Sequence, residues 1–69
     1  MADELDVEEY VDAQRFVQEL RKFADAVESG TDFTVTVKGQ QYTVPVGGRM
    51  QVEYESDNGG GEFCLGIEW

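Results

Sequence analysis

Apolar residues in the first half of the chain recur at the three- and four-residue spacing of an α-helix. At about 100° per residue they fall on one side of the helix, and Ala26 falls on the polar side. Asp12 suits the N-cap position, and Gly30 suits the left-handed position at which many helices end. The pattern predicts a helix from about Asp12 to Ser29. The residues of this apolar stripe are Ala13, Phe16, Val17, Leu20, Phe23, Ala24 and Val27.

From Thr31 onward, apolar and polar residues alternate, which is the spacing of β-strands with one apolar face. Gly39–Gln40 can form a two-residue hairpin turn with glycine first, Gly47–Gly48 interrupts the alternation, and residues 57–61 are typical of a flexible turn. The chain is therefore predicted to form four successive strands. Their apolar positions are Phe33, Val35 and Val37; Tyr42, Val44 and Val46; Met50, Val52 and Tyr54; and Phe63, Leu65, Ile67 and Trp69.

The segment before the helix allows two interpretations. Leu5 and Val7 alternate with acidic residues, which favours a short strand near residues 4–8. Asp6 and Glu9 have the spacing of a capping box, which would instead start the helix earlier. A longer helix would turn Val7 away from the apolar stripe, so we favour the strand.

Short connections between consecutive strands favour an antiparallel meander, and the apolar stripe of the helix is the other apolar surface that can cover its apolar face. We expect a single α+β domain over residues 1–69. One amphipathic helix packs on one face of an antiparallel β-meander of four strands, and residues 4–8 are a candidate fifth strand.

Composition adds a strong negative charge. The 69 residues include 15 Asp and Glu but only 5 Lys and Arg, so the formal net charge is -10. Binding of nucleic acid or an anionic membrane depends on basic residues, so neither partner is expected. A dense acidic surface is typical of a cytoplasm with molar salt, where screening weakens the repulsion between like charges.

The start of the chain supports the same compartment. The segment MADELDVEEY is acidic where a signal peptide carries positive charge, and no apolar run approaches the roughly 18 residues of a membrane span. We therefore predict a cytoplasmic protein.

The residue inventory argues against most catalytic chemistry. The chain has no His and a single cysteine, Cys64, so an internal disulfide, a zinc site of Cys and His ligands and a Cys–His nucleophile are all excluded. Glu53, Glu55 and Asp57 have the opening spacing of a calcium loop, but Asn58 and Cys64 stand where its glycine and final carboxylate belong. We predict neither an enzyme nor a bound cofactor.

Three residues at the end of the last strand are candidates for an interaction site: Trp69, Cys64 and Glu68. Trp69 shares the apolar parity of its strand, which favours packing in the core over contact with a partner. Cys64 alternates with that apolar face, and nearby acidic residues disfavour its thiolate. If the last strand lies at a sheet edge, a second copy of the chain could pair with it.

Most of the chain, and its C-terminal half most clearly, resembles the amphi-Trp domain family. The resemblance rests on the helix ending ADAVESG, the Val44–Pro45 step, the alternating segment MQVEYES and the final strand FCLGIEW, which stops on Trp69. It covers roughly Leu5 to Trp69. The resemblance implies a compact α+β domain and implies no activity.

Two classes of function follow. The first is an acidic interaction or scaffold module adapted to high salt, which binds an unknown protein partner or forms a homodimer through a sheet edge. The alternative is a carboxylate-based divalent-cation or small-ligand binding protein. An acidic decoy that imitates nucleic acid is a third hypothesis.

Overall fold

The fold is α+β, with one helix followed by four antiparallel strands. A computed structural model describes residues 4–69 of the chain. The α+β prediction is confirmed, and the strands follow one another in the expected order. The elements are α1 (Ala13–Ser29), β1 (Phe33–Val37), β2 (Gln40–Val44), β3 (Arg49–Asp57) and β4 (Gly60–Glu68).

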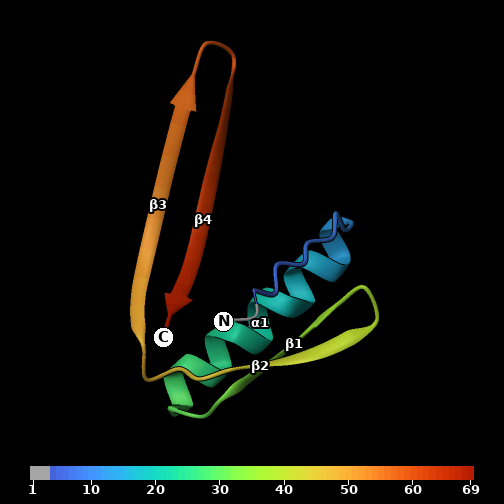
Figure 1. Ribbon diagram of the computed structural model, residues 1–69, viewed down its shortest axis with the longest axis vertical. Helices are drawn as coiled ribbons and strands as arrows, with labels where there is room; N and C mark the ends of the chain where they lie inside the picture. Colours follow the sequence, from blue (N-terminus) through green and yellow to red (C-terminus); the bar gives the residue numbers. More distant parts are fainter. Residues whose placement is uncertain (1–3) are drawn as a thin grey trace.

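The strands form two hairpins rather than one continuous sheet. Within the described residues, β1 pairs with β2 and β3 pairs with β4, each pair forming its own two-stranded sheet. The connection from Pro45 to Gly48 separates them. Pro45 has no amide donor for a ladder, and Val46 is buried in the core. The second hairpin, β3–β4, therefore projects away from the helix and the first hairpin, β1–β2 (Figure 1).

The helix has the boundaries and caps that its sequence predicts. The Asp12 carboxylate accepts a hydrogen bond from the Arg15 backbone N–H at 2.8 Å, and Gly30 adopts the left-handed conformation with φ 71°. In that position the Gly30 N–H is directed at the carbonyls of Ala26 and Val27. Both ends of the helix thus satisfy backbone groups that would otherwise lack partners.

Residues 4–12 form neither helix nor strand, so the candidate fifth strand at residues 4–8 is wrong. Side chains hold this segment instead. The Glu9 carboxylate accepts a hydrogen bond from the Lys38 backbone N–H at 2.8 Å and lies 3.8 Å from the Arg15 guanidinium. These contacts tie the segment to the turn of the first hairpin without forming a backbone ladder.

Both hairpin turns have two residues, and each differs from the turn that the sequence suggested. The first turn is formed by Lys38 and Gly39, one residue earlier than predicted, and both have positive φ, as a type I′ turn requires. The second turn is formed by Asn58 and Gly59, so Gly60 and Gly61 belong to β4. A Cβ on Gly61 would lie 2.8 Å from the Glu55 carbonyl oxygen, so glycine permits the close approach of β3 and β4 there.

The core is small and lies where the C-terminal half of α1 meets the first hairpin. Among residues 4–69, three hydrophobic residues are buried: Ala26, Phe33 and Val46. The rings of Phe23 and Phe33 pack with their centroids 5.4 Å apart. Ile67, near the end of β4, also packs against this cluster.

The helix is rotated relative to the expected packing. Its more covered residues are Arg15, Glu19, Phe23, Ala26 and Val27. The centre of this face lies roughly 90° around the helix from the centre of the apolar stripe, at about 100° per residue. The expectation that Ala26 faces solvent is therefore wrong. Phe16 remains largely uncovered, and Leu20 is partly exposed.

The chain is consequently more open than a compact domain of its length. Its radius of gyration is 13.5 Å, whereas about 11 Å is expected for 69 residues. Its accessible surface is 6022 Å², compared with about 4,300 Å² for a compact monomer of this mass. The second hairpin, which stands away from the helix, contributes to the excess surface, and so do residues 4–12, all of which are exposed (Figure 1).

Candidate interaction surface

The second hairpin is amphipathic across its width. On one face, cross-strand register pairs Met50 with Ile67, Val52 with Leu65, and Tyr54 with Phe63. The opposite face carries the pairs Arg49–Glu68, Gln51–Gly66, Glu53–Cys64 and Glu55–Glu62. Charge is therefore confined to one face of the hairpin, and the other face is apolar along most of its length.

The apolar face of the hairpin is largely uncovered. Val52 is 76% exposed, Tyr54 78% and Phe63 64%. On the helix, Phe16 is 61% exposed and Leu20 39% exposed. Single exposed apolar residues are common in proteins, but a contiguous set on two facing elements is typical of a binding surface.

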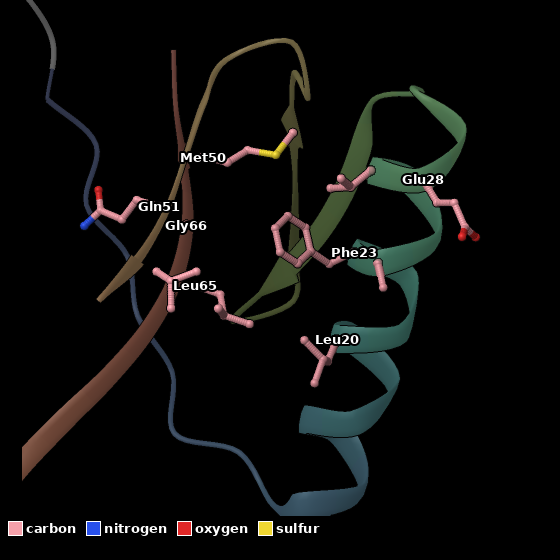
Figure 2. A pocket seen from close by; sticks show the side chains of 10 residues that line it. Leu20, Phe23, Glu28, Met50, Gln51, Leu65 and Gly66 are labelled. Atoms are coloured by element: carbon pink, nitrogen blue, oxygen red, sulfur yellow. The ribbon is translucent and has the colours of Figure 1, made fainter. Parts of the chain in front are cut away.

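These residues line two adjoining open hollows. One, of about 430 Å³, separates Leu20 and Phe23 of α1 from Met50, Val52 and Leu65 of the second hairpin. The other, of about 480 Å³, reaches Phe16, Phe33, Phe63 and Trp69. We call the two hollows together the apolar groove. Figure 2 shows Leu20, Phe23 and Met50 pointing into it, while Gln51 and Glu28 point away.

Trp69 is exposed, so the prediction that it packs in the core is wrong. Its indole is 76% exposed and lies at the border of the apolar groove. As its parity predicts, Trp69 lines the same hollow as Phe63, Leu65 and Ile67, but it lies one residue beyond β4 and no element covers most of its surface. Alternation identifies which residues share a face and carries no information about what covers it.

The three candidate residues do not form one site. Cys64 and Glu68 share the polar parity of β4, opposite Phe63, Leu65 and Ile67. Glu68 pairs with Arg49 across the base of the second hairpin, and both side chains are exposed. An exposed pair of this kind contributes at most about 1 kcal/mol. Of the three, Cys64 and Trp69 line the apolar groove, and Glu68 does not.

Cys64 has the environment of an unreactive thiol. Partial burial and the nearby carboxylates of Glu62, Glu53 and Glu55 raise its pKa. Reactive cysteines instead lie beside cations or helix N-termini, which lower the thiol pKa. Burial is the largest cause of the raised Cys64 pKa, and of the acidic neighbours expected to disfavour the thiolate, Glu62 contributes and Glu68 does not.

Glu19 is a carboxylate at the helix side of the groove. The hydrogen bond from Lys22, at 3.0 Å, and the charges of Lys22 and Arg15 lower its pKa. Its second oxygen, Oε1, is buried and has no hydrogen-bond partner among the described residues. Arg15 also donates to the Thr36 carbonyl oxygen, so it links this side of the helix to β1.

The described part of the chain also bears on metal binding and membrane insertion. Within residues 4–69, no three or more Cys, Asp or Glu side chains lie close enough together to hold a metal ion. In the same range, α1 is too short and too polar to span a membrane.

Comparison with known proteins adds no relative. No protein-family model matches the chain, and neither the curated proteins nor the solved structures searched include a match. The resemblance to the amphi-Trp domain family therefore stays a prediction.

The residues that sequence reasoning missed are the exposed members of the groove, above all Phe16, Val52 and Phe63. One signal could have identified them. The apolar alternation of the third and fourth strands extends the strands to nine residues each, whereas β1 and β2 have five each. A long hairpin next to a short one leaves apolar surface that a single helix cannot fully cover.

Proposed function

We propose that this chain is a small acidic interaction module that associates with further copies of itself through the apolar groove at high salt. The proposal rests on one observation, which is that the apolar and the acidic residues lie on separate surfaces. The apolar residues of α1 and of the second hairpin are uncovered and face one groove, while the acidic residues of the hairpin lie on its opposite face.

The size of the uncovered surface supports association. An aromatic side chain has roughly 150–250 Å² to bury, so Phe16, Tyr54, Phe63 and Trp69 together expose on the order of 400–700 Å². With Val52, Met50 and Leu65 the surface reaches on the order of 800 Å² per copy, which is the size of a standard interface for one partner. Monomeric proteins rarely leave so large an apolar patch uncovered.

The apolar face contributes more free energy than the sheet edges do. Each strand of a two-stranded sheet pairs on one side, so within the described residues every strand also has an open edge. Backbone groups at an open edge can bond to water, whereas apolar side chains gain free energy only by leaving water. Edge pairing can accompany association, but burial of the groove drives it.

Salt is expected to control this association. Two copies carry a combined formal charge of -20, twice the -10 of one chain. The Debye length falls from about 10 Å at 0.1 M salt to about 3 Å at 1 M, so the repulsion between copies weakens strongly. The affinity between copies should therefore rise with KCl concentration.

The test is the molar mass in solution, measured by light scattering after size exclusion in 0.2 M and 2 M KCl. We expect dimers at micromolar concentration in 2 M KCl and a shift towards monomer in 0.2 M. Val52→Glu should give monomer at both salts, whereas Gln51→Glu, which adds the same charge on the polar face, should not. Wild-type protein that stays monomeric at high concentration in 2 M KCl would overturn the proposal.

A further inference from the structure

We propose that two copies exchange their second hairpins, so that the apolar face of β3–β4 of each copy covers the apolar stripe on α1 of the other. This inference rests on the proposed function and specifies its geometry. The starting point is that both sides of the groove lack a cover. The centre of the apolar stripe on α1 and the apolar face of β3–β4 are both exposed within one chain.

The base of the second hairpin is packed in place, which opposes closure of the groove within one chain. Val46 is buried beside Ala26 and Phe33, and Ile67 packs on the same cluster. At the start of the hairpin, a Cβ on Gly48 would lie 2.1 Å from the Glu68 carbonyl oxygen, so this junction has no spare room. Folding the hairpin onto its own helix would disturb these contacts, whereas accepting a second hairpin would not.

The uncovered apolar stripe and the distribution of charge both favour the helix as the surface that receives the second hairpin. Residues 49–68 carry five acidic residues and one arginine, a formal charge of -4, whereas residues 13–29 carry three acidic and three basic residues, a charge of zero. Packing hairpin against hairpin would bring two charges of -4 together and leave both helices uncovered. Packing hairpin against helix avoids the repulsion and covers both apolar surfaces.

The two apolar surfaces also match in length. The stripe from Phe16 to Val27 spans about 16 Å at 1.5 Å per residue, and the segment from Met50 to Tyr54 spans about 13 Å at 3.3 Å per residue. A reciprocal exchange has two-fold symmetry, so each copy gives one hairpin and receives one. The area buried, on the order of 1,600 Å² in total, is that of a stable specific complex.

Disulfide trapping tests this geometry, with Cys64→Ser as the background. Leu20 and Val52 lie on opposite sides of the groove, and both are exposed enough for substitution without loss of the core. One preparation carries Leu20→Cys and a second carries Val52→Cys, and the two are mixed and oxidised in 2 M KCl. We expect the mixed Leu20→Cys and Val52→Cys dimer as the main cross-linked product, because the two Cβ atoms must approach to about 4 Å.

Three controls keep the outcomes distinct. Gln51→Cys replaces Val52→Cys as the matched position on the polar face and should give little mixed product. A chain with both Leu20→Cys and Val52→Cys should cross-link mainly to a second chain, and a predominantly intrachain disulfide would overturn the exchange. Phe16→Cys with Phe63→Cys provides a second pair across the groove, in case one substitution impairs folding.

Light scattering on the same samples separates the two proposals. Dimers in 2 M KCl without mixed cross-links, or with Val52→Cys linked mainly to itself, would overturn the exchange and leave self-association intact. Monomers throughout would overturn both.

Discussion

The two hairpins of this protein have the same alternating pattern and opposite environments. In the first hairpin, Phe33 is 8% exposed and packs against Phe23 of the helix. In the second, Phe63 has the equivalent parity and is 64% exposed, although its strand is longer and equally regular. Alternation therefore produces an amphipathic hairpin, while burial depends on a second element with a free apolar face. Here α1 covers one hairpin and leaves the apolar face of the other largely exposed.

The largest expected effect is the difference between two Phe→Ala substitutions. Phe33→Ala should destabilise the monomer by about 3–5 kcal/mol, which is comparable to the whole stability of a domain this small. Phe63→Ala should cost the monomer less than about 1 kcal/mol, because its ring is mostly in water already. Urea denaturation followed by circular dichroism measures both, in the monomeric Val52→Glu background.

Phe63 is expected to act on association rather than on the stability of the monomer. Phe63→Ala in the otherwise wild-type chain should weaken the dimer by at least about tenfold, as expected for an aromatic residue at the centre of an interface. Equal losses of monomer stability for Phe33→Ala and Phe63→Ala would show that the two hairpins are buried alike, and would contradict the contrast between them.

The next effect is the response to salt. Repulsion among the acidic residues should destabilise the fold in dilute buffer, so the melting temperature should rise by on the order of 10 °C between 0.1 M and 2 M KCl. The second hairpin concentrates this charge on one face. A triple variant, Glu53→Gln, Glu55→Gln and Glu62→Gln, should therefore show a smaller rise. A melting temperature that does not change with KCl would contradict the screening argument.

A smaller effect concerns the link between the helix and the first hairpin. Arg15 donates to the Thr36 carbonyl and lies near the carboxylates of Glu9 and Glu19. Arg15→Ala should destabilise the monomer by about 1–2 kcal/mol, because the Thr36 carbonyl loses its donor and Glu19 loses a neighbouring cation. Arg21→Ala is the matched control on the same helix, since Arg21 forms no ion pair with the described residues, and it should have little effect.

The smallest effect is a pH dependence that originates at Glu19. Its pKa is lowered in the folded state by the hydrogen bond from Lys22 and the charges of Lys22 and Arg15. A carboxyl with a lowered folded pKa stabilises the fold above its unfolded pKa, and this contribution disappears as pH falls through the folded pKa.

Denaturation of wild type and Glu19→Gln from pH 3 to pH 6 measures that contribution. The difference in free energy of unfolding between the two proteins should be larger at pH 6 than at pH 3. The comparison cancels the titration of the other carboxylates, which both proteins share. A difference that does not change with pH would show that the ion pairs of Glu19 do not favour its charged form in the folded chain.

Much of the local structure could be predicted from the pattern of residues. The Asp12 cap, the left-handed Gly30 and the 3.6-residue periodicity together defined the helix to within a residue, because all three depend on contacts within the helix itself. Strand order and antiparallel pairing followed from short connections. The exact turn at Lys38–Gly39 did not, since Lys38 must adopt a positive φ that its residue type does not favour.

Periodicity and charge alone thus determined the elements, their order, and the separation of apolar from acidic faces, since each of these follows from the spacing of neighbouring residues. Tertiary structure decided which apolar faces are covered. The face of α1 that carries Ala26 packs against the core, and the strands divide into two sheets at Pro45. Trp69 and the second hairpin remain exposed. Coverage depends on how distant segments meet in space. A repeat of two or 3.6 residues does not determine which distant segments contact one another, so the apolar groove could be recognised only in the folded chain.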